Sequence, residues 1–346
     1  MTINISVIIP FFYPKQNVIG SDEYFALHAF EKSLSAVFKS NYKNFEVIAV
    51  SDFSNKQSIE IAMKYPCKII RLSKNGGSAA ARNKGASLAK GKILIFLDSD
   101  VQIKKDALGL INKSYNSKKK EIALQGVYSH APNYDKYITQ YLQSYHCYYL
   151  FSEVEKKKYT ETLCTNIFSI KRDIFLKLRG FDASFNNANS EDAEFGFRLI
   201  KMGYKIPIER KVNTIHHTNF GLWSCIKRII RIHTGEMKMY LRNKTILMKV
   251  KQKNYSAVIA GITLVLFGLS ISALNLFYKI PHFFHIFIII NLLFIGIHLG
   301  FLNFVYSTKG FLTCCMAVIY TYLHRLLFIY CIGIGIVDFY IFGRKY

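Results

Sequence analysis

Four short runs of β-branched and other apolar residues recur along the first hundred positions and are typical of strands buried on both faces. Between them lie longer runs whose apolar residues are spaced as on one face of a helix. The predicted strands are 5–10, 45–50, 67–72 and 93–97, and the predicted helices are 24–39, 58–64 and 78–88. This alternation predicts an α/β domain with parallel neighbouring strands, in which ligands bind beyond the carboxyl ends of the strands.

The chain becomes almost uncharged after residue 255. Residues 256–278 form an uncharged run of 23 residues, which is long enough to cross a hydrocarbon layer of about 30 Å. Residues 283–306 form a second such run, and a third apolar stretch at 311–342 carries Arg325 near its centre. We therefore predict transmembrane helices at about 256–278, at 283–306 and within 311–342. The third stretch is either one long spanning helix or an interfacial segment followed by a span.

Basic residues concentrate just before the apolar tail. The formal net charge is +24, and between residues 201 and 253 thirteen lysines and arginines stand against two glutamates. Basic residues beside a span mark the cytoplasmic side of a membrane. We predict a catalytic domain at 1–220, a basic amphipathic juxtamembrane segment at 221–255 and a transmembrane region at 256–346. The apolar positions of 222–241 lie either on the membrane surface or against the protein itself.

Charge and cysteine usage narrow the class of protein further. Nucleic acid is not an expected partner, because the chain contains no recognisable nucleic-acid-binding module. The seven cysteines are scattered without the spacing of a zinc site, so we expect reduced thiols. The first residues are typical of a strand and not of a signal peptide. The sequence thus predicts a multi-pass protein of the inner or plasma membrane, with membrane lipids as partners and its catalytic domain in the cytosol.

Acidic residues follow two of the predicted strands. Asp98 and Asp100, separated by Ser99, come directly after the fourth strand. Two carboxylates in this D-x-D arrangement can hold Mn²⁺ or Mg²⁺, which prefer oxygen ligands and keep positions open for substrate phosphates. Asp52 follows the second strand, where it can accept a hydrogen bond from a nucleobase or cap a turn or helix.

The predicted helix 78–88 begins after Asn75 and Gly76 and contains Arg82. Glycine permits a close backbone approach, and the amides at a helix N-terminus favour anions such as phosphate. A plain loop with a helix cap is the alternative. The spacing matches neither the dinucleotide-binding nor the P-loop motif.

Two later pairs of residues are further candidates. Glu191 and Asp192 begin a helical run, where a carboxylate is either a cap or a general base that deprotonates an acceptor hydroxyl. His216 and His217 follow some 25 residues later. A neutral imidazole there can complete a metal site or contact a diphosphate, although adjacent histidines on a strand are often structural.

Taken together, these segments resemble the family-2 glycosyltransferases, which have the GT-A fold. The likeness extends over about residues 3–235 and is carried by six short motifs in the expected order: Ser6-Val7-Ile8-Ile9-Pro10, Val47-Ile48-Ala49-Val50-Ser51-Asp52-Phe53-Ser54, Asn75-Gly76-Gly77 with Ala81-Arg82-Asn83-Lys84-Gly85, Phe96-Leu97-Asp98-Ser99-Asp100, Lys171-Arg172 with Gly180-Phe181-Asp182, and Glu191-Asp192 with Phe195, Arg198-Leu199 and Gly203-Tyr204. The resemblance implies an α/β, Rossmann-like nucleotide-sugar-binding domain followed by transmembrane α-helices.

The resemblance also implies a role for each matching residue. Asp192, with Glu191 beside it, would be catalytic, with Asp192 as the base. The nucleotide sugar would be bound by Pro10, Phe12, Asp52, Asn75, Gly76, Arg82, Asp98 and Ser99, with Asp52 on the base. Mn²⁺ or Mg²⁺ would be held by Asp98, Asp100 and His217, or by His216 in place of His217.

The implied activity is a metal-dependent, inverting transfer of a single hexose-type sugar from a nucleotide-sugar donor, expected to be UDP-linked. The acceptor would be a lipid-linked saccharide or glycan of cell-envelope synthesis. Trp223 is not part of a Q-x-x-R-W motif, which disfavours the processive polysaccharide synthases. Ser51 stands where the family often has an aspartate, so the resemblance does not decide which nucleotide is bound. The alternatives are a polyprenyl-phosphate glycosyltransferase and a catalytically silent membrane scaffold of the same fold.

Overall fold

The chain folds into two compact units. The computed structural model describes residues 3–13, 22–117, 121–129, 134–152, 158–160, 163–185, 190–242 and 253–343. The first unit consists chiefly of Met1–Pro132 and Leu150–Asn219, and the second of Asn133–Tyr149 and Phe220–Lys345. Part of the predicted juxtamembrane segment, 243–252, lies outside the described residues.

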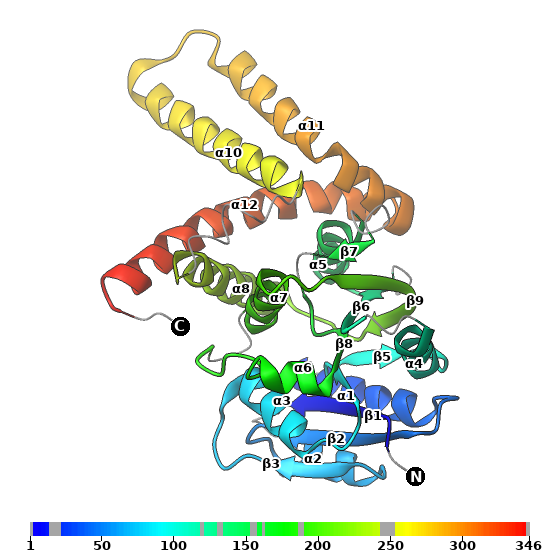
Figure 1. Ribbon diagram of the computed structural model, residues 1–346. Coiled ribbons are helices and arrows are strands. Elements are labelled where there is room, and N and C mark those ends of the chain that lie inside the picture. Colours follow the sequence, from blue (N-terminus) through cyan, green and yellow to red (C-terminus); the bar gives the residue numbers. More distant parts are fainter. Residues whose placement is uncertain are drawn as a thin grey trace. The chain divides into compact units, whose positions relative to one another are not determined.

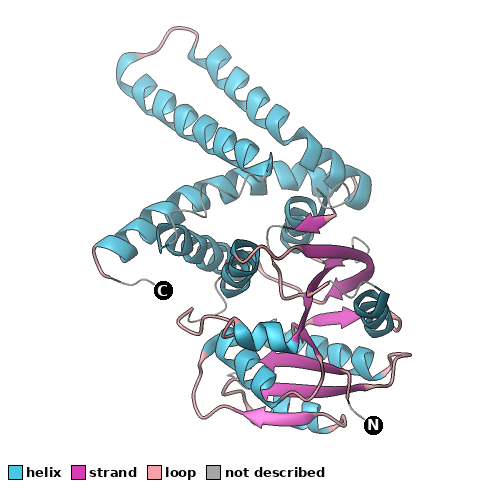
Figure 2. Ribbon diagram, viewed as in Figure 1, coloured by secondary structure: helices cyan, strands magenta, loops and turns pink. Residues whose placement is uncertain are grey.

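A mixed nine-stranded sheet forms the centre of the first unit (Figures 1 and 2). Its strand order is β3-β2-β1-β4-β8-β6-β9-β5, and β7 pairs with β9. The strands are β1 (Ile5–Phe11), β2 (Phe45–Ser51), β3 (Lys68–Arg71), β4 (Ile93–Leu97), β5 (Val101–Ile103), β6 (Ala123–Tyr128), β7 (Tyr159–Thr160), β8 (Ile167–Lys171) and β9 (Ile206–His216). The helices are α1 (Asp22–Phe38), α2 (Lys56–Met63), α3 (Gly77–Leu88), α4 (Ala107–Ser117), α6 (Arg172–Lys177) and α7 (Glu191–Lys201).

The first four strands confirm the predicted α/β arrangement. β1 pairs in parallel with β2 and β4, and β2 pairs in parallel with β3. Beyond β4 the sheet is no longer purely parallel, because β8 is antiparallel to both β4 and β6. The parallel pairing brings the carboxyl ends of β1, β2 and β4 to one edge of the sheet, where the predicted site residues follow.

Burial explains why β4 contains only apolar residues. All five of its side chains are buried, and a strand covered on both faces has no position for a polar residue. Phe96 of β4 lies in an aromatic cluster with Phe175 and Phe181, at ring-centroid distances of 4.9 and 5.0 Å. Phe195 of α7 joins this cluster at 5.0 Å from Phe181. The packing thereby fixes the start of α7 relative to the D-x-D loop.

The second unit is helical. It contains α5 (Tyr137–His146), α8 (Leu222–Arg242), α10 (Lys253–Tyr278), α11 (Phe283–Lys309) and α12 (Phe311–Tyr340), and the π-helix η1 (Cys147–Ser152) follows α5. Its core joins residues of α5, α8, α11 and α12, among them Tyr141, Cys225, Ile229, Phe301 and Ala317. α5 groups with the C-terminal helices because its apolar side packs on them.

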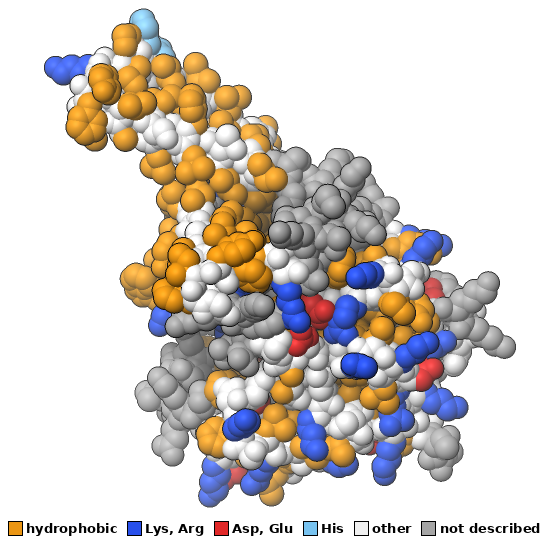
Figure 3. All heavy atoms as spheres, turned by 60° about the vertical axis from the view of Figure 1, so that its left-hand side comes forward, with side chains coloured by type: hydrophobic (Ala, Val, Ile, Leu, Met, Phe, Trp, Pro, Cys, Tyr) orange, Lys and Arg blue, Asp and Glu red, His pale blue; other side chains and the backbone are white. Residues whose placement is uncertain are grey.

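Three helices of this unit are long and apolar enough to cross a membrane: Ala257–Tyr278, Phe283–Lys309 and Phe311–Tyr340. Many of their large apolar side chains are exposed, and hydrophobic atoms dominate this surface (Figure 3). In α8, Cys225, Ile229 and Met239 are buried. The apolar side of the amphipathic helix therefore packs within its own unit, largely along α12.

Candidate functional site

Asp52 follows β2 at the carboxyl edge of the sheet and is bound to the start of α3. Its Oδ1 accepts a hydrogen bond from the Gly76 amide at 2.7 Å, and its Oδ2 accepts one from the Gly77 amide at 2.9 Å. Gly77 has a φ of +81°, a conformation that favours glycine. Asn75 also accepts from the Gly77 amide, at 3.1 Å. Asp52 thus caps α3, one of the two roles that the sequence left open, and its contact with a nucleobase stays a prediction.

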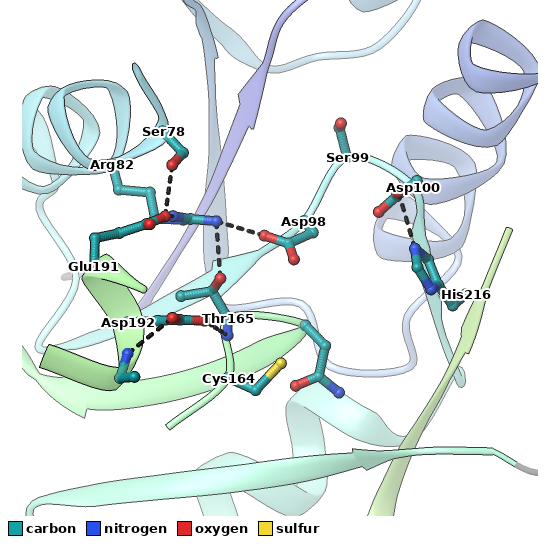
Figure 4. Close-up of polar contacts among 12 residues, drawn as sticks. Ser78, Arg82, Asp98, Ser99, Asp100, Cys164, Thr165, Glu191, Asp192 and His216 are labelled. Carbon is teal, nitrogen blue, oxygen red and sulfur yellow. Dashed lines mark hydrogen bonds and ion pairs between the residues drawn. The ribbon is translucent and has the colours of Figure 1, made fainter. Parts of the chain in front are cut away.

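Arg82 connects three segments of the site (Figure 4). Its Nη1 donates to Oε1 of Glu191 at 2.7 Å, and its Nη2 donates to Oδ1 of Asp98 at 2.7 Å and to Oγ1 of Thr165 at 2.8 Å. Ser78 donates a further hydrogen bond to Glu191 at 2.6 Å. Burial alone would lower the pKa of Arg82, but Asp98 and Glu191 raise it above its ordinary value, so the guanidinium stays charged.

Asp192 lies beside this network without contacting Arg82 directly. Its Oδ1 accepts from the Ala193 amide at 2.8 Å and its Oδ2 accepts from the Thr165 amide at 3.3 Å. Burial, followed by the neighbouring Glu191 carboxylate, raises the pKa of Asp192 to about 7. A carboxylate with this pKa can exchange a proton near neutral pH, as a general base must.

The two predicted catalytic carboxylates therefore have different surroundings. Glu191 is 3% exposed and bound by Arg82 and Ser78, whereas Asp192 is only partly buried. Both follow Ser190, a non-glycine residue with a φ of +64°. Such strained residues cluster at functional sites. The geometry favours Asp192 for proton transfer and Glu191 for holding Arg82.

The D-x-D loop presents two partly exposed carboxylates. The side chains of Asp98 and Asp100 are 29% and 31% exposed, respectively. Oδ2 of Asp100 lies 3.0 Å from Nε2 of His216, and Ser99 lies 3.1 Å from the Tyr13 hydroxyl. Burial raises the pKa of Asp98, while Arg82 opposes this effect.

His217, the histidine predicted as a metal ligand, does not meet Asp100 through its side chain. Its Nε2 lies 2.6 Å from Oε1 of Gln102, and burial lowers its pKa. Among the described residues, no group of three His, Cys, Asp or Glu side chains is arranged to hold a metal ion. A cation here would therefore take two carboxylates from the loop and its remaining ligands from water and substrate phosphates, as Mg²⁺ commonly does.

Pro10 and Phe12 lie at the end of β1. Pro10 is buried within the strand, and Phe12, just beyond it, is 43% exposed. An exposed aromatic ring at the carboxyl edge of the sheet can stack on a planar ring of a ligand. The contacts of Pro10 and Phe12 with a nucleotide sugar stay predictions.

Thr165 bridges the site, although no sequence motif indicates it. Its hydroxyl accepts from Arg82 and its amide donates to Asp192. Thr165 precedes β8 within Cys164-Thr165-Asn166, a stretch without a motif, and it meets Arg82 across 83 positions. Only the pairing of β8 beside β4 could have indicated that it lies near the D-x-D loop.

Comparisons with known proteins indicate the family of part of the chain. The family model "Glycosyl transferase family 2" matches residues 23–179. The chain is 26% identical over 137 residues to the glycosyltransferase GlyG of Streptococcus pneumoniae, covering 38% of this chain and 40% of GlyG. It is 34% identical over 80 residues to the UDP-Glc:alpha-D-GlcNAc-diphosphoundecaprenol beta-1,3-glucosyltransferase WfgD of Escherichia coli, covering 22% of this chain and 32% of WfgD. The matched regions are thus less than half of either relative.

Structural similarity extends further along the chain. The mannosyltransferase PcManGT from Pyrobaculum calidifontis aligns with a TM-score of 0.54 at 14% identity, covering 97% of this chain and 87% of that one. At this identity the similarity shows the fold, which is GT-A. With its D-x-D loop at the end of β4 and the matched segment, the chain contains a Glycosyl transferase family 2 domain of the GT-A fold, followed by three long apolar helices.

Proposed function

We propose that this protein transfers a single hexose from a UDP-sugar to a lipid-linked saccharide, with inversion at the anomeric carbon, at the cytosolic face of the plasma membrane. The observation that carries this proposal is the network around Arg82, which holds Asp98 of the D-x-D loop and Glu191 beside Asp192 in one place. In the proposed reaction this network would bring the donor-binding carboxylate and the base together.

The names of similar proteins support the choice of substrates. WfgD is named for a UDP-glucose donor and a diphosphoundecaprenol-linked acceptor, and PcManGT was solved in complex with GDP-mannose and Mn²⁺. The three long apolar helices suit an acceptor that is carried by a membrane lipid. A diphosphate-linked saccharide is therefore preferred here to a bare polyprenyl phosphate as the acceptor.

In this reaction the acceptor hydroxyl loses its proton to Asp192 as its oxygen attacks the anomeric carbon. The bond from that carbon to the diphosphate oxygen breaks on the opposite face, so the configuration inverts and UDP leaves. Arg82 stays charged and fixes the Asp98 carboxylate at the donor end. Asp98 and Asp100 would hold Mn²⁺ or Mg²⁺, whose charge would offset the charge that develops on the leaving diphosphate. Alignment for in-line attack supplies much of the remaining acceleration.

Calorimetric titration of the purified full-length protein tests the donor site. We expect UDP and one UDP-sugar to bind in the presence of Mn²⁺, and EDTA or the Asp100→Ala substitution to abolish this binding. GDP and GDP-sugars serve as the control for the base. If the folded protein binds no nucleoside diphosphate, the proposal fails and the catalytically silent scaffold takes its place.

A further inference from the structure

Arg325 is a buried cation at the middle of α12. Its side chain is 0% exposed. Nη1 donates to the Tyr145 hydroxyl at 3.4 Å and Nη2 donates to Nε2 of His298 at 3.3 Å. Both contacts are longer than an ordinary N–H···O or N–H···N hydrogen bond. The guanidinium is therefore surrounded by neutral groups that satisfy it only weakly.

Other buried cations of the protein are held much more tightly. Arg82 binds two carboxylates at 2.7 Å each, and Lys238 of α8 binds Asp338 of α12 at 2.6 Å. Within the described part of the chain, by contrast, no carboxylate pairs with Arg325, and its Nε, like that of Arg82, has no hydrogen-bond partner. A buried charge without a counterion is costly, so this arrangement favours an anionic ligand.

Neighbouring residues hold the guanidinium in place without neutralising it. Nδ1 of His298 donates to the Phe294 carbonyl oxygen at 2.8 Å, so Nε2 is left as the acceptor that faces Arg325. The Tyr145 ring lies 5.8 Å from the guanidinium carbon. On α10, a Cβ placed at Gly261 would come within 3.4 Å of Nε of Arg325. The cluster therefore orients the guanidinium and brings α10 against its unpaired nitrogen.

The contacts of α12 with α8 indicate the depth of this cluster. Besides Lys238–Asp338, the imidazoles of His233 on α8 and His324 on α12 meet at 2.8 Å. The two helices thus run together on both sides of Arg325. α8 also carries Lys227, Arg228 and Arg231, which require water or lipid headgroups and not hydrocarbon. With these side chains on the helix packed along α12, we expect Arg325 to lie near the headgroups, where lipid phosphates are found.

We propose that Arg325 binds a phosphate group, which in the reaction proposed above is the diphosphate of the lipid-linked acceptor. The identity of the ligand rests on that proposed function. A guanidinium presents paired N–H donors that match phosphate oxygens. The Tyr145 hydroxyl lies beside it as a further donor. α10, which has the smallest buried share of the three long apolar helices, lies against Nε of Arg325 at Gly261.

Farnesyl phosphate, farnesol and sodium phosphate distinguish the possible sources of this phosphate. Their binding to the full-length protein in dodecyl maltoside is measured by equilibrium dialysis and by the shift in melting temperature. We expect wild-type protein to bind farnesyl phosphate, and Arg325→Met to lose at least about tenfold in affinity, as expected for loss of hydrogen bonds to a charged group. Arg228→Met removes an arginine of α8 that lies against Phe220, and it should bind as wild type does.

Each outcome of these measurements either supports or overturns the phosphate site. Competition by sodium phosphate at similar affinity upholds the phosphate site and assigns it to free phosphate, whereas binding of farnesol as strong as that of farnesyl phosphate overturns it. If Arg325→Met does not fold, Arg325→Gln decides, because it removes the charge and keeps a polar side chain at this position. Equal affinity of wild type and this variant overturns the proposal. UDP binding is measured in parallel: UDP binding without farnesyl phosphate binding overturns only this site, and the reverse overturns only the proposed function.

Discussion

Arg82 and Glu191 are 109 positions apart in the chain and form a buried ion pair of 2.7 Å between α3 and the first residue of α7. The same guanidinium binds Asp98 after β4 at the same distance. A single side chain therefore fixes the relative positions of the D-x-D loop and the helix that carries Asp192. Its removal should disturb both at once.

Substitution Arg82→Met should destabilise the protein by about 3–5 kcal/mol, because it leaves Glu191 buried without its partner. Donor binding should fall with it. Thermal unfolding and calorimetric UDP binding measure the two effects. Lys84→Met on the exposed side of the same helix is the control and should leave both unchanged. Addition of Glu191→Gln to Arg82→Met should restore part of the stability, and its failure to do so would argue against the ion pair as the cause.

Transferase activity should rise with pH up to about pH 7, because Asp192 must be deprotonated to act as a base and its pKa is raised to about 7. Below that pKa the rate should fall about tenfold per pH unit. A bound divalent cation favours the carboxylate and would move the midpoint to lower pH. Initial rates at saturating donor, measured from pH 5 to 9, test this profile. A wild-type rate in the Asp192→Asn variant would exclude Asp192 as the base.

The same shift predicts how stability depends on pH. The pKa of Asp192 is about 7 in the folded protein against an ordinary 3.8, so the folded state binds the proton more tightly. The stabilisation of the folded state by this bound proton is complete below pH 3.8 and is lost as the pH rises toward 7. Wild type should therefore lose stability relative to Asp192→Asn over this range. Melting temperatures of the metal-free proteins at several pH values measure the difference, which should be constant if the pKa is ordinary.

His216 should matter more than His217 for Mn²⁺-dependent UDP binding. The imidazole of His216 contacts Asp100, whereas that of His217 is held by Gln102. Loss of a residue that orients a metal ligand typically costs about 10–100-fold in metal affinity. We expect His216→Gln to fall in this range and His217→Gln to change less, by calorimetric Mn²⁺ titration in the presence of UDP. The reverse order would make His217 the ligand, as the sequence predicted.

Asp52→Ala should cost about 1 kcal/mol of stability, because α3 loses its cap. Asn55→Ala is a matched control, since Asn55 caps α2 by accepting from the Ser58 amide at 2.9 Å. Both variants should be destabilised to a similar extent in thermal unfolding. If Asp52 also binds the nucleobase, only Asp52→Ala should lose affinity for UDP. Equal UDP affinity in the two variants would leave Asp52 with the capping role alone.

Two glycines of α10 test how tightly the second unit packs around His298. A Cβ at Gly261 would lie 2.8 Å from Cε1 of His298, whereas one at Gly268 would meet Ile290 at an ordinary 3.6 Å. Gly261→Ala should therefore destabilise by about 1–3 kcal/mol. Gly268→Ala should be neutral or slightly stabilising, because alanine favours helix. Thermal unfolding in detergent compares them, and equal melting temperatures would show that α10 does not pack on His298.

The local pattern of apolar and polar residues was sufficient to predict the strands and helices that carry the site residues. The apolar run 93–97 corresponds to β4 residue for residue, since a strand buried on both faces leaves a continuous apolar signal. The partners of the site residues could not be predicted in the same way. The sequence around Asp52 is the same whether this residue caps α3 or binds a nucleobase. Thr165 contacts Arg82 only because β8 pairs with β4. Contacts across such distances depend on topology, which periodicity does not encode.

The arrangement around Arg82 also constrains how this protein can diverge. Asp98, Thr165 and Glu191 each accept a hydrogen bond from the guanidinium of Arg82, and Ser78 donates one to Glu191. A substitution at one of these residues therefore leaves a buried charge or donor at another. Single substitutions at these positions should therefore be selected against, whereas simultaneous replacement of the whole set is still possible. Among descendants of this gene, these residues should be inherited together or exchanged together, which makes their joint pattern a better marker of shared chemistry than the D-x-D motif alone.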